Sequence, residues 1–192
     1  MPDLIDELVG VAAGSRLDGL RAKRPVARSD AQATYDGLIT APSDLARATA
    51  PERAAIGWWV AALSGAPSLV VHYGALLDPA VRAALVAALP AATTSGPYGS
   101  YPPGPLSDED EDGLRWAASD ELRDAIGERL AAALEHAHLL TYRPREASPA
   151  ALQALLDAGW STDGVVTVSQ LVAFTHFQLR VVAGLTVLKE TH

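Results

Sequence analysis

Alanine and leucine dominate this sequence, and its β-branched residues gather only near the C-terminal end. Alanine and leucine lose little conformational entropy on joining a helix, whereas strands favour β-branched and aromatic side chains. The β-branched stretch at 165–172 has no flanking segment of similar character with which it could pair. The sequence therefore predicts an all-α fold, with no credible strand and no internal repeat of fixed period.

Glycine, proline and capping residues divide the chain into the predicted helices. The run from Thr49 to Glu52 is typical of a helix start, because Thr49 can cap it and Glu52 complements the positive end of its dipole. This helix is expected to run to about Ser64, where Gly65 and Pro67 end it. Other helical segments are expected at 3–24, 28–39, 68–77, 78–89, 114–118, 119–140, 148–159 and from 161 onward.

Residues 90–113 are rich in proline, glycine and serine and end in five consecutive acidic residues and a glycine. We interpret this segment as a loop, with the acidic run facing solvent. Loops of this length inside a compact domain are uncommon and are often functional or disordered. The segment separates 1–89 from 114–192, but each part has few helices to bury, so we expect one domain over residues 1–192.

The charge of the chain argues against binding to nucleic acid. Its net charge is −8 and its lysines and arginines are scattered, whereas phosphate contacts need a basic patch. The first ten residues lack the basic region and long apolar region of a secretory signal, so we expect a cytoplasmic protein.

The longest apolar run, 165–188, has the length of a membrane span but contains polar side chains. Such groups are costly at the depth of a bilayer. We therefore interpret the run as a helix of a soluble core or of an oligomer interface. Its polar residues include Gln170, His176, Gln178 and Arg180.

Glu52, Ser68 and His72 are the first candidates for a functional site. A histidine held by a carboxylate can act as an acid or base near neutral pH, and Ser68 lies one helical turn before His72. Ser68 is explained equally well as a helix cap, and a single histidine in an Ala/Leu-rich helix is usually a packed side chain. Both interpretations stay open at this point.

Three further side chains are candidates for contact with a substrate. His176 and Arg180 lie four residues apart on one helix face, either in a buried polar contact or oligomer interface, or lining a pocket where Arg180 orients an anion. Trp58 and Trp59 are adjacent and point different ways, so one is expected in the core and the other, taken here as Trp59, in a pocket wall or interface.

His136 and His138 suggest a metal site at first sight. They lie two residues apart, so on a helix they face different sides, whereas metal-binding histidine pairs favour a spacing of four. We therefore expect no metal site here, and none elsewhere in the chain.

The layout of residues 51–77 resembles the core of the alkylhydroperoxidase D / carboxymuconolactone decarboxylase family. It has an acid-led helix, a Gly/Pro break and a second helix with His72. A second match covers 139–185, where a capped helix ending in Ala-Gly precedes an apolar helix bearing AF-x-x-F-x-x-R. The resemblance is to the uncharacterised, peroxidase-related branch. It implies the alkylhydroperoxidase D-like helical fold and a homo-oligomer, whether dimer, trimer or hexamer.

In the peroxidase branch of that family a CxxC pair precedes the histidine, but this chain contains no cysteine. Counting back from His72 places the cysteine positions at Gly65 and Ser68, and counting from Glu52 places them at Ala66 and Leu69. A serine hydroxyl cannot replace the thiolate that attacks a peroxide and then forms a disulfide. The resemblance therefore implies a family member without thiol peroxidase activity.

The resemblance also implies roles for the residues that remain. His72 matches the proton-relay histidine and Glu52 the acid at the head of the preceding helix. One expectation is proton-transfer chemistry like that of the decarboxylase branch, with His72 as acid/base, Glu52 orienting it, Arg180 clamping a small anionic substrate, and no cofactor. The alternative is a non-catalytic module that kept the fold for ligand binding or assembly.

Overall fold

The computed structural model describes residues 3–190, and within them the fold is all-α, as the composition predicts. The one β-type contact described is an isolated antiparallel bridge between Gly99 and Glu111. The elements are α1 (Leu4–Val9), α2 (Arg16–Ala22), α3 (Pro25–Tyr35), the π-helix η1 (Asp36–Thr40), α4 (Ala50–Leu63), α5 (Pro67–Gly74), α6 (Pro79–Ala92), the 3-10 helix η2 (Ser107–Glu109), α7 (Asp120–Ile126), α8 (Glu128–Tyr142), the 3-10 helix η3 (Pro144–Glu146), α9 (Pro149–Asp157) and α10 (Thr162–Glu190).

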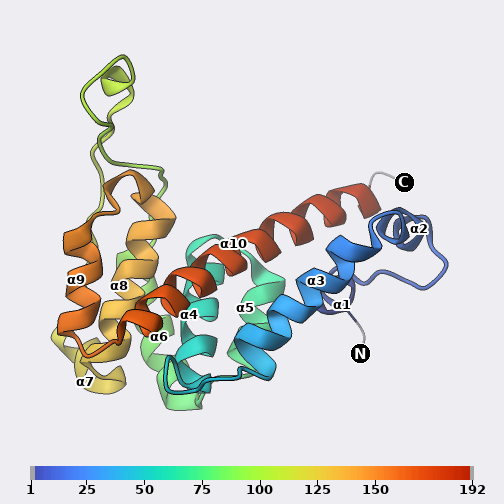
Figure 1. Cartoon of the computed structure of the whole chain (residues 1–192), viewed down its shortest axis with the longest axis horizontal. Helices are drawn as coiled ribbons and strands as arrows, with labels where there is room; N and C mark the ends of the chain where they lie inside the picture. Colours follow the sequence, from blue (N-terminus) through green and yellow to red (C-terminus); the bar gives the residue numbers. More distant parts are fainter. Residues whose placement is uncertain (1–2, 191–192) are drawn as a thin grey trace.

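Helix α4 lies at the centre of the core. It packs against α5, α8 and α10, and its side chains are buried on nearly every side, with Ile56 and Trp59 fully enclosed. Figure 1 shows α7, α8 and α9 gathered at one end of the molecule, α1, α2 and α3 at the other, and α10 running between the two ends. The hydrophobic core is therefore built mainly around α4, the helix whose start and end the sequence predicts most clearly.

The start of α4 confirms the predicted capping. Thr49 Oγ1 accepts a hydrogen bond from the Glu52 amide, and Glu52 Oε2 accepts one from the Thr49 amide at 2.7 Å. This reciprocal pair is a capping box, which satisfies two of the amides that a helix start leaves without partners. Asp78 likewise caps α6, as predicted.

Several predicted helix boundaries are wrong. The segment predicted at 3–24 is two helices, α1 and α2, and α3 begins at Pro25 and not at 28. Ser68 does not cap α5, because that helix begins at Pro67, with Ala66 at the cap position and no side-chain cap. The helix predicted over 119–140 is two helices, since Gly127 adopts a positive φ of 82° between α7 and α8. Residues 114–118, predicted as a short helical piece, are not helical.

The loop after α6 protrudes from the rest of the molecule in Figure 1. Its base is fixed to the end of α8 by a hydrogen bond from the Tyr98 amide to the Tyr142 carbonyl, at 2.6 Å. Further out, the Arg145 guanidinium lies 4.1 Å from the centre of the Tyr101 ring, and the Arg145 side chain donates to the carbonyl of Gly99. The loop is therefore tied to the last residue of α8 and to Arg145 beyond it.

Helix α10 is buried over its first part and exposed toward its end. Its buried side chains run from Gly164 to Val182, and beyond Val182 the side chains are half-buried or exposed. By length and apolar composition this helix could cross a bilayer, which is weak evidence alone. Within the fold its Gln178 accepts a hydrogen bond from the Tyr73 hydroxyl at 2.6 Å, so the structure is compatible with a soluble protein.

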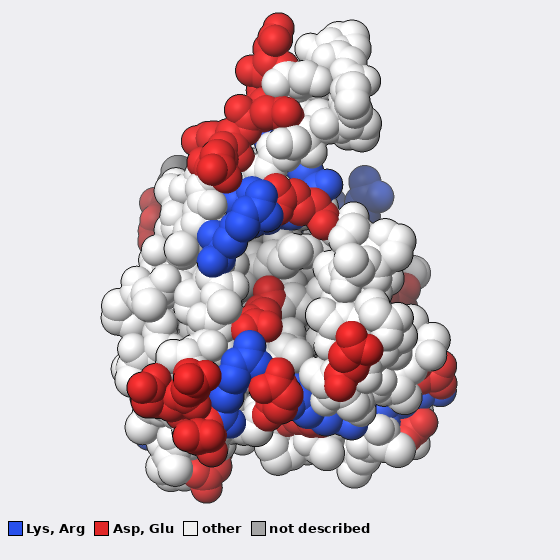
Figure 2. All heavy atoms as spheres, turned by 90° about the vertical axis from the view of Figure 1, so that its left-hand side faces the viewer, with Lys and Arg blue, Asp and Glu red and all other residues white. Residues whose placement is uncertain are grey.

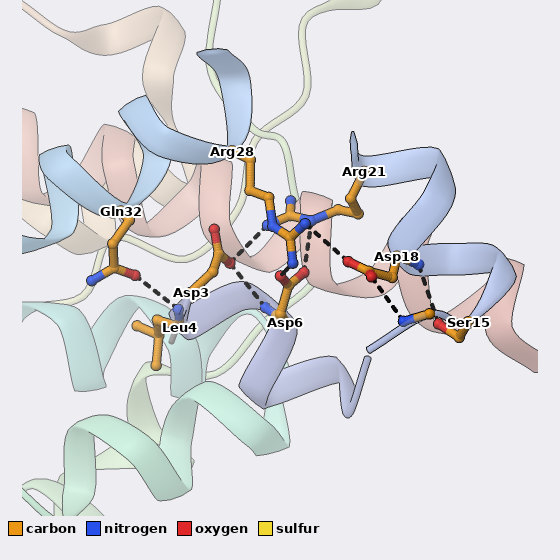
Figure 3. A network of polar contacts seen from close by, with 9 residues as sticks. Asp3, Leu4, Asp6, Ser15, Asp18, Arg21, Arg28 and Gln32 are labelled. Carbon is orange, nitrogen blue, oxygen red and sulfur yellow. Dashed lines mark hydrogen bonds and ion pairs between the residues drawn. The ribbon is translucent and has the colours of Figure 1, made fainter. Parts of the chain in front are cut away.

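Ion pairs hold the N-terminal helices together (Figure 3). Arg21 on α2 contacts both Asp3 and Asp6 at 2.7 Å, and Arg28 on α3 contacts Asp6 and, at 3.0 Å, Asp18. A small apolar cluster lies beside this network and includes Val182 of α10, with Ile5, Val9, Leu17 and Ala31. The network and the cluster together attach α1, α2 and α3 to the later part of α10.

Candidate functional site

His72 lies half-buried on α5, and its hydrogen-bond partner is a phenol. The Tyr35 hydroxyl, from the end of α3, lies 2.8 Å from His72 Nε2. Burial lowers the pKa of His72, and the negative charge of Glu7 partly opposes that shift. The carboxylate that influences this imidazole therefore comes from α1, and not from the head of α4.

Glu52 makes contacts different from those expected. Its Oε2 accepts hydrogen bonds from the Thr49 amide and hydroxyl, and its Oε1 accepts one from Arg129 Nε of α8 at 2.8 Å. These contacts use the carboxylate to cap α4 and to join α4 to α8. The expected Glu52–His72 pair is not formed in this structure.

The remaining predicted residues are dispersed. Ser68 lines an apolar cavity of about 710 Å³ between α1, α5 and α10. His176 Nε2 lies 3.2 Å from the Thr141 hydroxyl, while the exposed Arg180 donates to the His176 carbonyl on its own helix. Trp59 is fully buried, and its ring lies 5.0 Å from that of Trp116. The structure therefore does not place Arg180 as a clamp over His72.

A pocket that the sequence did not predict lies between α8 and α9. Its volume is about 200 Å³, and residues 115–116, η3 and both helices line it. We call it the α8–α9 pocket. Figure 2 faces this end of the molecule and shows a hollow with acidic and basic side chains around it. Its polar lining is formed by Arg115, Glu135, His136, His138, Arg143 and Glu146, and its apolar lining by Trp116, Leu139, Leu155 and alanines.

His136 is the unusual residue of this pocket. Its side chain belongs to a residue only 6% exposed, and neither ring nitrogen has a hydrogen-bond partner among the described residues. Burial lowers the pKa of His136, so the ring is neutral at neutral pH. A neutral imidazole has one donor and one acceptor, and leaving a buried polar group without a partner costs about 1–3 kcal/mol. The pocket wall therefore contains an imidazole whose two nitrogens are enclosed, each exposing less than 1 Å², and have no partner among the described residues.

His138, two residues further along α8, has its own partner. Its Nε2 donates a hydrogen bond to the Ala92 carbonyl at the end of α6, at 3.0 Å, and burial lowers its pKa. The Trp116 ring lies 5.7 Å from the His138 ring. The two histidines thus make different contacts, although both line the same pocket.

The charged groups around the pocket are paired with one another. Glu146 accepts from Arg143 at 2.6 and 2.7 Å and from Arg115 at 2.8 Å, and these contacts, Arg143 first, lower its pKa to about 2. On the other side Glu135 accepts from the Ala118 amide at 2.8 Å and from Arg123. The pocket therefore contains the buried, neutral His136 ring. The charged side chains at its rim are paired with one another.

The described residues contain no group of three or more His, Cys, Asp and Glu side chains arranged to hold a metal ion. His136 and His138 attract attention in the sequence only as a possible metal pair. The surroundings of these two histidines depend on how α9 and the loop pack against α8. The spacing of residues within α8 does not determine that packing.

Comparisons with models of protein families, with curated proteins and with solved structures found no match to this chain. The candidate site therefore rests on its own geometry.

Proposed function

We propose that this protein binds a small molecule in the α8–α9 pocket, on an alkylhydroperoxidase D-like scaffold that lacks the family's thiols. The observation that carries the proposal is His136, a buried neutral imidazole that lines a pocket and has neither ring nitrogen satisfied by a described residue. Native proteins rarely leave such groups without a partner. Both nitrogens are enclosed in this structure, so a bound molecule supplies a partner when the ring turns toward the pocket.

The composition of the pocket supports this function. Small-molecule sites are concave and mostly apolar, with a few polar groups that fix the orientation of the ligand. Here alanine, leucine and Trp116 side chains form the apolar walls, and His136 supplies the polar group. The paired charges at the rim hold η3 and the loop in place, which gives the pocket a fixed shape.

Binding without catalysis is better supported than proton transfer at His72. The carboxylate expected to orient His72 is occupied by Thr49 and Arg129, and Arg180 contacts its own helix. Tyr35 holds the His72 ring but supplies no negative charge. Thiol peroxidase chemistry is disfavoured, because this sequence has no cysteine to form a thiolate of its own.

We propose in addition that the protein associates with copies of itself and that it is located in the cytoplasm. Apolar side chains are exposed along α10, and exposed apolar surface is available for contact with another protein chain. The exposed apolar residues of α10 are Val166, Phe177, Val187 and Leu188.

A fragment screen by NMR tests the proposed binding. The full chain is labelled with ¹⁵N, and the His136 ring signals are followed while small neutral, anionic and cationic compounds are added. We expect some of these compounds to shift the His136 signals. Ala154 of α9 is exposed and lines the pocket. The larger side chain in Ala154→Trp should fill the pocket and abolish the shifts.

The matched control is Gln153→Trp, on the same helix but outside the pocket lining, which should keep the shifts. The proposal fails if no compound moves the His136 signals, or if Ala154→Trp leaves the shifts intact.

A further inference from the structure

A second pocket lies at the other end of the molecule from the α8–α9 pocket. Its volume is about 220 Å³, and it lies between the turn after α1, helix α2 and the end of α10 (Figure 1). We call it the α2–α10 pocket. Its apolar lining is formed by residues 10–12, Leu17, Leu20 and Leu188, and its polar lining by Ser15, Arg16 and Lys189. Two cationic side chains therefore line one small, mostly apolar pocket.

Arg16 is a cation without a described partner. Its side chain is exposed and forms no ion pair or hydrogen bond with a described residue. It stands at the start of α2, where a positive charge opposes the helix dipole, so helix stability does not account for it. The nearby Arg21 and Arg28, by contrast, are held by carboxylates (Figure 3). The Arg16 guanidinium is therefore accessible to a molecule that enters the pocket.

Lys189 is held beside the same pocket by a backbone contact. Its ammonium group donates a hydrogen bond to the Val9 carbonyl at the end of α1, at 2.8 Å. An ammonium group has three N–H donors, so two remain for a ligand. No described carboxylate forms an ion pair with Lys189, and no described carboxylate lines the pocket. The pocket thus carries excess positive charge in a protein whose net charge is −8.

The two cations select the charge of a ligand, and the apolar walls select its size. Both cations offer only hydrogen-bond donors, a carboxylate offers only acceptors, and a guanidinium can bind both oxygens of one carboxylate. A cavity of about 150 Å³ is large enough for benzene. A volume of about 220 Å³ therefore has room for one ring or a short branched chain beside the carboxylate.

We propose that the α2–α10 pocket binds a small monocarboxylate with a compact apolar body, either an aromatic ring or a branched aliphatic chain. The carboxylate is held by Arg16 and Lys189, and the apolar body lies against Leu17, Leu20 and Leu188. This site shares no residue with the α8–α9 pocket, so the two proposals stand or fall separately.

NMR titration of the full ¹⁵N-labelled chain at neutral pH tests this site, with benzoate as the probe. Benzamide has the same ring without the charge, acetate has the charge without the ring, and benzylammonium has the opposite charge. We expect benzoate to shift the amide signals of Gly10 and Val11 and the side-chain Nε–H signal of Arg16. It should bind at least about fivefold more tightly than the other three probes.

Three variants at exposed positions separate the pocket from the general charge of this end of the molecule. Arg16→Gln should weaken benzoate binding at least about threefold, because it removes the guanidinium charge. The matched control Lys23→Gln removes an exposed charge at the other end of α2, outside the pocket lining, and should leave the affinity unchanged. Ala12→Trp, at an exposed position that lines the pocket, should block it and abolish the shifts.

The outcomes that overturn this inference are distinct from those that overturn the proposed function. The inference is wrong if benzamide binds as tightly as benzoate, or if Lys23→Gln weakens binding as much as Arg16→Gln does. It is also wrong if Ala12→Trp leaves the shifts intact, or if benzoate shifts no signal of the α2–α10 pocket. The His136 ring signals report binding at the α8–α9 pocket separately, so a benzoate that shifts only these signals also contradicts the inference.

Discussion

Arg143 shows how different two ion pairs of one residue can be. Its guanidinium is almost fully buried and contacts Glu146 at 2.6 Å, and it also lies 3.6 Å from Asp112, whose side chain is 93% exposed. The contacts with Arg143 and Arg115 hold the pKa of Glu146 at about 2, so this carboxylate stays ionised well into acid. The contribution of Glu146 to stability is present above pH 4.5 and is lost as the pH falls toward 2.

We predict that Glu146→Gln lowers the free energy of unfolding by about 3 kcal/mol, because it leaves the buried Arg143 without its carboxylate. The matched control, Asp112→Asn, removes the exposed partner of the same arginine and should change the free energy by less than about 1 kcal/mol. Urea unfolding at neutral pH, followed by tryptophan fluorescence, measures both values. Equal losses in the two variants would contradict the assignment of Glu146 as the main partner.

At the level of elements, Gly127 decides where α7 ends and α8 begins. Its φ of 82° and ψ of 151° lie in a region that only glycine adopts readily. Gly184, by contrast, lies within α10 on an exposed part of the helix. A Cβ added at either position would meet no atom within 4 Å, so substitutions at the two glycines differ in backbone conformation alone.

We predict opposite effects for the same substitution at these glycines. Gly127→Ala should destabilise the fold by about 2 kcal/mol, because alanine is strained in this conformation. Gly184→Ala should stabilise it by about 0.5–1 kcal/mol, because alanine loses less entropy than glycine in a helix. Thermal and urea unfolding report both signs, and a stabilised Gly127→Ala would show that α7 and α8 can join into one helix.

Across the whole molecule, four buried or half-buried histidines share one electrostatic property. Burial is the main cause that lowers the pKa of each, below the ordinary value of 6.5: these are His72, His136, His138 and His176. The fifth histidine, His192, lies outside the described residues. Below pH 6.5 the unfolded chain therefore binds more protons than the native fold, and stability falls as the pH falls.

We predict that the free energy of unfolding is higher at pH 7.5 than at pH 5.5. One pH unit below 6.5, each imidazole that stays neutral in the native fold contributes at most about 1.4 kcal/mol to the loss. His136→Gln should make the dependence on pH shallower, since the variant has one fewer group that takes up a proton on unfolding. Stability that is constant between these pH values would contradict neutral, buried imidazoles.

Local sequence features explain why the helices could be predicted in such detail. The caps at Thr49 and Asp78 and the end of α9 before Gly159 depend on atoms a few residues apart, so the sequence contains all that decides them. The misplaced boundaries have equally local causes. Pro67 starts α5 two residues earlier than a Ser68 cap allows. Gly127 interrupts a row of leucines whose spacing is that of a single helix.

The sequence alone determined that the chain is helical, where most helices start, and that it offers no cysteine thiol. Only the tertiary structure decided which side chains meet. Glu52 pairs with Arg129, 77 residues away, and His72 meets Tyr35. Within residues 3–190, His136 is left without a hydrogen-bond partner beside a pocket. The reason is that a helix boundary is set by hydrogen bonds within one or two turns, whereas a site is set by how whole helices pack. The spacing of residues along one helix defines its faces but does not determine which distant helix packs against each face.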